Sequence, residues 1–219
     1  MCFYFRQSKE ALAVANRFKV TLKNGESLSS AQIINGFSHP KCAVITDKEP
    51  DIINNYSWGL IPAGSDESIQ RYTLNARIET LEQRRSYKSV INNRCLIIAD
   101  GFYEWKERIF NGKEYKDRYL ITMEDNGLFA FAGLYSGWKR DNGATFHNSF
   151  TILTTQANQV VAAIHSKKRM PVILSREDEL RWLGGMPYKM VGHPYSVLLK
   201  ATQSIDDKPK REEFTVPLF

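Results

Sequence analysis

Position 2 carries the residue best suited to chemistry in this chain. Cys2 directly follows the initiator methionine, which is usually removed when the next side chain is this small. The mature chain would then begin with an α-amine and a β-thiol on one residue, with ordinary pKa values of about 7.7 to 8.0 and about 8.5. Such an aminothiol forms a Schiff base with an aldehyde, after which the thiolate closes on the imine carbon to give a thiazolidine.

Two other interpretations of Cys2 stay open at this point. An N-terminal nucleophile hydrolase would attack an amide with this thiol and would use the chain's own amine as the base. A free cysteine is also among the residues most often buried in a core, so a purely structural role is the plain alternative. Cys42 and Cys95 are far from it in sequence, and this spacing predicts neither a disulfide framework nor a cysteine-rich zinc site.

Three further segments carry side chains suited to acid–base work or to anion binding. Asn75 and Arg77 are two residues apart and share a side if that run is extended. Glu104 lies between two aromatic residues after an apolar run, where partial burial would raise its pKa and let it donate and accept protons. His165 ends a predicted helix and precedes a run of cations that finishes at Arg169. Taken alone, each of these residues is more often structural than catalytic.

Helices are predicted from the 3.6-residue spacing of apolar side chains and from capping signals. The first begins after Ser8, whose hydroxyl would cap it, and its apolar face would contain Leu12, Ala15 and Phe18. A second helix is expected over residues 78–90. The remaining signals are an Asn158 cap for a short helix that runs into His165, and a Ser175–Asp178 capping box for a helix that Gly184 stops.

Strands are predicted to outnumber helices. The uniformly apolar run 95–99 is expected at the centre of a sheet. The runs 119–124 and 128–138 flank Asp125-Asn126-Gly127, a pattern typical of a hairpin, and Asn111-Gly112 predicts another turn. Because strands and helices are not regularly interleaved, we expect an α+β fold with a mainly antiparallel sheet or barrel and flanking helices. Further strands are expected at 43–46, 57–62, 103–107, 150–155 and 170–174.

Composition excludes several classes of protein. The 219 residues, 42% hydrophobic and 25% charged, are typical of a globular protein with one domain. No run is long and apolar enough for a spanning helix or an export signal, so a cytoplasmic location is expected. We expect a domain over 1–203 and a charged surface tail over 204–219. The net charge of +6 permits an anionic partner, and the four histidines lack metal-ligand spacing.

An ordered set of short motifs runs through nearly the whole chain, and it carries far more information than any one of them. The set resembles the SOS response-associated peptidase (SRAP) family, which implies that family's barrel-like α+β fold. The motifs, in chain order, are Met1-Cys2, His39-Pro40, Trp58 to Pro62, Asn75 to Thr80, Arg94 to Trp105, Ala130 to Leu134, Thr154-Thr155, His165 to Leu174 and His193 to Val197.

The resemblance implies a function. Family members cap abasic sites in single-stranded DNA through their N-terminal cysteine, so Cys2 would form a thiazolidine cross-link after loss of Met1, as part of the DNA damage response. His165 would assist opening of the sugar ring, Glu104 would shuttle protons, and Asn75 would hold the opened sugar or the amine by hydrogen bonds. The expected enzyme is a self-processing peptidase with lyase-like cross-linking chemistry that needs no cofactor.

The resemblance also implies a surface that binds a DNA strand. When bound to DNA, the protein would be associated with the nucleoid. Arg77 and Arg169 would hold phosphates, since guanidinium binds them bidentately. Trp58 and Pro40 would supply a stacking or wedging surface that favours single strands. No membrane and no obligate protein partner is expected.

One departure and two alternative functions remain. The family usually begins Met-Cys-Gly-Arg, whereas this chain has Phe3-Tyr4. Either Tyr4 stacks and hydrogen-bonds in place of the arginine, or strand binding is weaker. The first alternative is a thiol peptidase for protein substrates, which would use Cys2, Glu104 and His165 but has little need of a basic face. The second is a non-covalent reader of single-stranded or modified DNA, in which the cysteine is incidental.

Overall fold

Five strands close into a barrel at the centre of the molecule. The structure is a computed structural model, and it describes residues 2–23, 28, 30–140, 145–192 and 198–204. Neighbouring strands of the barrel are antiparallel, except that β5 and β11 close the ring in parallel. The barrel strands, in order around the ring, are β11 (Thr145–Gln156), β10 (Phe129–Arg140), β7 (Arg94–Ala99), β4 (Lys41–Thr46) and β5 (Ile52–Trp58).

Short strands extend the barrel at its edges. The strand β6 (Asn75–Arg77) pairs in parallel with β11, and β12 (Arg169–Pro171) pairs with β11 in antiparallel fashion. Two more strands are β13 (Ile173–Leu174), beside β10, and β2 (Thr21–Leu22), beside β5. The expected strand over 170–174 is therefore divided between two partners. The pairings of β6 and β12 bring the Asn75 and Arg169 segments to the same barrel strand.

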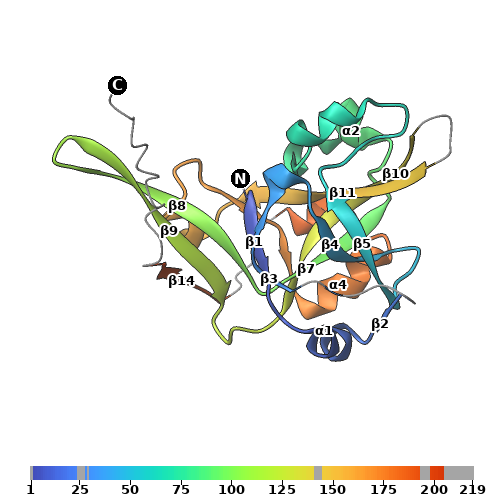
Figure 1. The fold of residues 1–219 in the computed structure, drawn as a ribbon, viewed down its shortest axis with the longest axis horizontal. Helices are drawn as coiled ribbons and strands as arrows, with labels where there is room; N and C mark the ends of the chain where they lie inside the picture. The colour runs from blue at the N-terminus through green and yellow to red at the C-terminus, as the bar shows by residue number, and fades with distance from the viewer. Residues whose placement is uncertain (1, 24–27, 29, 141–144, 193–197, 205–219) are drawn as a thin grey trace, which may run out of the picture.

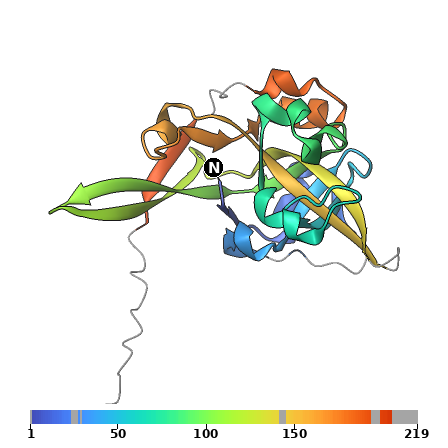
Figure 2. The ribbon, with the colours of Figure 1, turned by 90° about the horizontal axis from the view of Figure 1, so that it is seen from above.

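A second, five-stranded sheet stands against the barrel. Its order is β14 (Leu199–Gln203), β9 (Lys113–Met123), β8 (Gly101–Phe110), β1 (Tyr4–Gln7) and β3 (Ala31–Asn35). The β8–β9 hairpin projects well beyond the body (Figures 1 and 2). Its turn has positive φ at Asn111 (50°) and Gly112 (71°), which two-residue hairpin turns require and which Asn-Gly tolerates. The predicted turn is therefore confirmed.

The prediction of a hairpin around Asp125 is wrong, because the two strands that flank this turn do not pair with each other. The local turn forms as its residue types suggest, because the Asp125 carboxylate accepts a hydrogen bond from the Gly127 N–H at 2.8 Å and Asn126 has φ 55°. However, β9 pairs with β8 and β14, whereas β10 pairs with β7, β11 and β13. The turn is therefore a crossing between the two sheets. Turn chemistry is local, and it does not specify which strands pair.

The first helix, α1 (Ala11–Phe18), departs from its predicted cap and face. Glu10 occupies the cap position without a side-chain hydrogen bond. The Ser8 hydroxyl instead donates to the buried carboxylate of Asp100 at 2.6 Å. Val14 is the buried residue of the helix, whereas Leu12 is 72% exposed. The demand of a buried carboxylate for hydrogen-bond donors outweighs the local capping role of Ser8.

The helix expected over 78–90 is also broken. A 3-10 helix, η3 (Ile78–Gln83), is followed by extended backbone at Arg84 and by the short α2 (Arg85–Lys88). The hydroxyl of the buried Tyr87 donates to the carbonyl oxygen of Asn75 at 3.1 Å. This long-range bond turns the segment back toward β6, which a continuous helix would not do.

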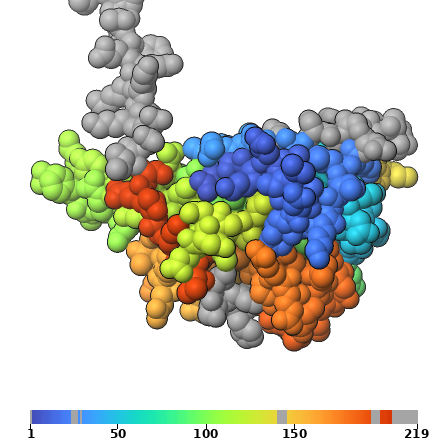
Figure 3. Space-filling model, turned by 90° about the horizontal axis from the view of Figure 1, so that it is seen from below, coloured from blue at the N-terminus to red at the C-terminus, as the bar shows by residue number. Residues whose placement is uncertain are grey.

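Other predictions from local sequence are confirmed. The Asn158 side chain accepts the Val161 N–H and begins α3 (Gln159–Ala162). Ser175 accepts the Asp178 N–H and begins α4 (Arg176–Leu183), which ends at Gly184. Figure 3 shows α1 (dark blue) beside α4 (orange), joined by the Arg17 and Glu179 ion pair of 2.8 Å. Within the described residues, further 3-10 helices are η1 (Gly36–Ser38), η2 (Glu67–Tyr72) and η5 (Tyr188–Val191).

The α+β class with an antiparallel sheet and barrel is therefore confirmed as a single domain. The run 95–99 lies at the centre of the barrel sheet as expected, between β4 and β10. Of the predicted tail at 204–219, only Ser204 lies within the described residues, and the motif at 193–197 lies outside them. Among the helices that the structure describes, none is long and apolar enough to cross a membrane.

Gly133 gives a test of barrel packing. A Cβ at this position would overlap Cδ1 of Ile97 and would lie 2.7 Å from the carbonyl oxygen of Thr151. We expect Gly133→Ala to lower the free energy of unfolding in urea by about 1 to 3 kcal/mol, the usual cost of overpacking. Gly192→Ala is the control, because its Cβ would meet ordinary van der Waals distances. Equal losses in the two variants would show that the barrel is less tightly packed than described.

Candidate active site

Cys2 lies immediately before β1 and is fully buried. Its Sγ donates to the carbonyl oxygen of Tyr4 at 3.5 Å, and its own carbonyl oxygen accepts a hydrogen bond from Nδ2 of Asn75 at 2.8 Å. Burial raises the pKa of the Cys2 thiol well above its ordinary value, and the negative charge of Glu104 raises it further. The thiol is therefore held in its protonated form at neutral pH.

Glu104 is the carboxyl group nearest to this chemistry. It lies in β8 and is only 3% exposed. Burial raises the pKa of Glu104 to about 7, because a carboxylate is poorly solvated in the protein interior. Both protonation states are consequently populated at neutral pH. A carboxyl group with this pKa can both donate and accept a proton near pH 7.

His165 follows α3 and faces Glu104. Its Nε2 lies 3.6 Å from Oε2 of Glu104, and its Nδ1 accepts the backbone N–H of Arg169 at 3.3 Å. Burial lowers the pKa of His165 to about 4, and the positive charge of Lys167 lowers it further. The ring is thus neutral at pH 7. Since Nδ1 is an acceptor, the ring proton resides on Nε2, directed at Glu104.

Asn75 is held at the start of β6 by its parallel pairing with Ile152 of β11. Its Nδ2 donates to Cys2, and its backbone carbonyl accepts the Tyr87 hydroxyl. Its Oδ1 is buried and forms no hydrogen bond with any residue in the described part of the chain. A buried amide oxygen of this kind is a strong acceptor for a donor that enters the site.

Two hollows adjoin the residues around Cys2. One has a volume of about 400 Å³ and includes Glu104 and His165 in its lining; the other, of about 490 Å³, includes Asn75 and Arg77. Cys2 accepts a hydrogen bond from Asn75, and the charge of Glu104 raises the pKa of its thiol. Cys2 therefore interacts with one lining residue of each hollow. The first hollow is completed by Phe3, Tyr4, Trp105, Glu107, Lys116, Ser166 and Lys167, and the second by Ile69, Tyr72, Thr73, Thr80, Arg84, Ser86 and Tyr87.

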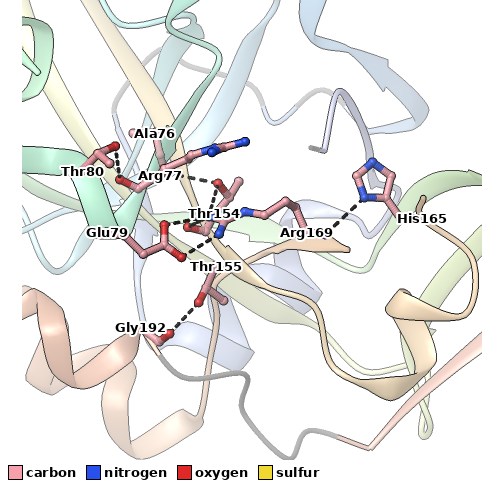
Figure 4. Close-up of polar contacts among 9 residues, drawn as sticks. All are labelled: Ala76, Arg77, Glu79, Thr80, Thr154, Thr155, His165, Arg169 and Gly192. Atoms are coloured by element: carbon pink, nitrogen blue, oxygen red, sulfur yellow. Dashed lines mark hydrogen bonds and ion pairs between the residues drawn. The ribbon is translucent and has the colours of Figure 1, made fainter. Parts of the chain in front are cut away.

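The two arginines expected to bind phosphate differ sharply (Figure 4). Arg77 is exposed at the end of β6, and its side chain extends away from the carboxylate of Glu79. Arg169 is committed: its guanidinium contacts both carboxylate oxygens of Glu79 at 2.6 and 3.0 Å, and the Thr154 carbonyl at 2.7 Å. In the structure Arg169 ties β12 to η3 while its N–H orients His165, and its expected contact with phosphate stays a prediction.

Trp58 does not form the expected stacking surface, whereas the expected wedging role of Pro40 stays a prediction. Trp58 is fully buried, its ring is stacked on Phe150 at 6.2 Å, and its Nε1 donates to the Leu74 carbonyl at 2.8 Å. Pro40 is half-buried, and its carbonyl accepts the Trp58 N–H at 2.9 Å. Trp58 is the last residue of a barrel strand, and its side chain belongs to the hydrophobic core. A tryptophan in a short motif does not reveal which side of a strand faces solvent.

Sequence reasoning missed other aromatic and basic residues of this region. Trp105 lines the first hollow and meets Tyr4 edge-on, with ring centroids 4.9 Å apart. Lys167, which belongs to the run of cations between His165 and Arg169, lines the same hollow. A signal for Trp105 existed, because it directly follows Glu104 in an expected strand. No local signal distinguished Lys167 from its neighbours.

The remaining cysteines lie in the barrel. Cys42 and Cys95 are buried in β4 and β7, and all three cysteines are free. Burial raises the pKa of both thiols. Across the described ranges, no group of three or more His, Cys, Asp or Glu side chains is arranged to hold a metal ion. Cys2 differs from the other two thiols in its contacts with Asn75 and Glu104.

Several known proteins are similar to this chain in sequence or in fold. The abasic site processing protein YoqW of Bacillus subtilis is 40% identical over 142 residues, which cover 64% of this chain and 61% of that protein. The abasic site processing protein HMCES of Gallus gallus is 30% identical over 158 residues, covering 63% of this chain and 46% of that protein. The matched region thus spans only about half to three fifths of these relatives.

A solved structure of a Bacteroides thetaiotaomicron protein matches with a TM-score of 0.83 and 30% identity, covering 92% of this chain and 91% of that one. The family model described as SOS response associated peptidase (SRAP) matches residues 1–205. This match covers nearly the whole chain and includes Cys2, Asn75, Glu104 and His165. The chain therefore belongs to the SRAP family.

Proposed function

We propose that this chain processes abasic sites in single-stranded DNA by forming a thiazolidine cross-link through Cys2, after it has removed its own Met1. The observation that carries the proposal is the hydrogen bond from Asn75 to Cys2, together with the effect of the Glu104 charge on the Cys2 thiol and the position of His165 beside Glu104. The names of relatives such as YoqW and HMCES support the same substrate. An abasic sugar supplies the aldehyde that an aminothiol captures.

The protonated thiol supports an order of steps. The Cys2 amine first adds to C1′ of the open sugar, and the resulting carbinolamine loses water to form an imine. Glu104, with a pKa near 7, donates the proton that the departing hydroxyl needs. The nitrogen keeps its hydrogen, so the imine forms in its protonated state. The resulting carboxylate then accepts the thiol proton as sulfur bonds to the imine carbon, and the π electrons of the C=N bond become the lone pair of the nitrogen. A five-membered ring results, with one water released.

His165 and Asn75 have complementary tasks in this scheme. A closed abasic sugar opens when its ring oxygen gains a proton and its C1′ hydroxyl loses one. The carboxyl group of Glu104 donates its proton to the ring oxygen and accepts the hydroxyl proton on its other oxygen, while the neutral His165 donates a hydrogen bond from Nε2 to the ring oxygen. The amide of Asn75 fixes the Cys2 backbone, and its buried Oδ1 accepts a hydrogen bond from the opened sugar or the amine.

The strand approaches past Arg77. This guanidinium lines the second hollow with Arg84, and both are exposed. Exposed cations next to the site attract phosphates without reading bases, as a lesion-specific protein needs. A thiol peptidase for other proteins is less well supported, because it has little use for exposed cations beside the site.

Cross-linking tests the proposal directly. We expect the protein, mixed with a single strand that bears an abasic site, to give a shifted band on a denaturing gel. The intact mass of the protein should correspond to a chain that lacks Met1, because a retained methionine blocks the α-amine of Cys2. Cys2→Ala should abolish the band, whereas Cys42→Ala should retain it. A band that persists in Cys2→Ala, or cleavage of a peptide panel with no DNA attached, would favour the alternative functions.

Binding and chemistry should separate in three variants. We expect Glu104→Gln and His165→Ala to slow cross-linking by about 10²- to 10⁴-fold, as for lost acid–base catalysis, while strand affinity is retained. Arg77→Ala should weaken affinity and reduce the slope of log K against log salt by about 1. Arg85→Ala is the control for charge alone. Affinity is measured by fluorescence anisotropy, and equal losses of affinity in all three variants would contradict the assigned roles.

The pH profile isolates Glu104. Because burial raises its pKa to about 7, its protonated form disappears as pH rises through 7, and the cross-linking rate should fall above that value. Glu104→Gln cannot titrate, so its slower rate should keep rising toward pH 8 as the amine loses its proton. His165, with a pKa lowered to about 4, should add no inflection between pH 5 and 9. Identical pH optima in the two proteins would falsify the role of Glu104.

A further inference from the structure

An aromatic wall borders the hollow that contains Glu104 and His165. It comprises Phe3, Tyr4, Phe37 and Trp105. The ring of Phe37 lies 4.8 Å from that of Phe3 and 6.4 Å from that of Tyr4, and Tyr4 lies 4.9 Å from Trp105. Three of these residues line the hollow, and Phe37 extends the wall outward with 55% of its surface exposed.

Phe37 is exposed on a firmly anchored turn. Its N–H is bound by the Asn35 side chain at 3.0 Å, and the Gly36 N–H donates to the Phe3 carbonyl at 2.9 Å. A Cβ at Gly36 would lie 3.0 Å from the ring of Trp58, so the turn rests directly on that buried ring. The outer part of the Phe37 ring nevertheless stays exposed, and an exposed apolar surface beside a hollow is typical of a binding site.

Lys167 stands on the same hollow, beyond His165. It is exposed, and no side chain in the described ranges forms an ion pair with it. By contrast, the other lysine of the hollow, Lys116, lies 3.8 Å from Glu107. The turn that carries Lys167 is fixed by the Lys168 N–H, which donates to the His165 carbonyl at 2.9 Å, and by the positive φ of Lys168. Lys167 is therefore the cation of this rim with its charge uncommitted.

We propose that the aromatic wall and Lys167 form a nucleotide subsite next to the abasic site. The base of the neighbouring nucleotide stacks on Phe37 and Tyr4, and its phosphate contacts the ammonium group of Lys167. This inference rests on the proposed function, to which it adds the recognition of the flanking nucleotide. The wall adjoins Glu104 through Trp105, so a base on it belongs to the nucleotide beside the reacting sugar.

The chemistry of the subsite fits a single strand. Every base has an aromatic face, so stacking tolerates any sequence, and one stacked base contributes about 1 to 3 kcal/mol to binding. In a duplex that face is already covered by the neighbouring pairs. An acidic peptide would use Lys167 but would leave the wall uncovered. The pairing of an exposed aromatic surface with a cation therefore selects an unpaired nucleotide.

The test uses a strand that cannot be cross-linked. A tetrahydrofuran abasic analogue has no aldehyde, and a 2-aminopurine placed directly 5′ or 3′ to it reports stacking through loss of fluorescence. We expect quenching at one of these two positions. Phe37→Ala should remove it and weaken binding by about fivefold or more, whereas Phe37→Tyr should keep it. Lys167→Ala should keep the quenching but reduce the salt slope by about 1.

Matched controls are available on another surface. Phe146 is 61% exposed, and with Lys48 it lines a hollow that shares no lining residue with the candidate site. Phe146→Ala and Lys48→Ala should leave quenching and salt slope unchanged. Absence of quenching at both positions, or quenching unaffected by Phe37→Ala, would overturn the subsite. If Cys2-dependent cross-linking of an aldehyde-bearing strand persists in that case, the proposed function stands while this inference fails.

Discussion

The burial of one carboxyl group governs the chemistry that the rest of the site can perform. Glu104 is almost inaccessible to water, and its pKa is raised to about 7 for that reason. Its charge in turn raises the pKa of the Cys2 thiol, and the same dry surroundings lower that of His165 to about 4. Burial therefore shifts the pKa of each of the three groups in the direction that favours its uncharged form. A site of this kind exchanges protons with a bound sugar more readily than it stabilises a permanent thiolate.

How much of the fold could be predicted depended on whether the deciding interaction was local. The caps at Asn158 and Ser175 and the turn at Asn111-Gly112 involve neighbours within a few residues, and all three form as expected. Ser8 looked equally suited to a cap, but Asp100, more than ninety positions away, takes its hydroxyl. The segment after Asp125 likewise turns as its residues dictate and then enters a different sheet. Pairing partners arise from the closed barrel, which no short window of sequence contains.

The candidate site shows the same division. The four residues proposed for chemistry were found through their types and motifs, and the fold brings Asn75, Glu104 and His165 around Cys2 from separate elements. The binding residues were harder to find. Trp58 and Arg169 have suitable side chains, yet one fills the core and the other is neutralised by Glu79. Both still contribute indirectly, since Trp58 supports the turn of Phe37 and Arg169 orients His165. Side-chain type identifies a capability, whereas exposure decides whether a ligand can use it.

The projecting β8–β9 hairpin and the buried carboxyl group of Glu104 belong to one continuous ladder of paired residues. Its strands are paired without a break from the tip, where Phe110 faces Lys113, to the base, where Glu104 faces Tyr119. Six residues of strand correspond to a length of about 20 Å. The position of Glu104 is therefore set by backbone pairing that extends well beyond the hollow that its side chain lines.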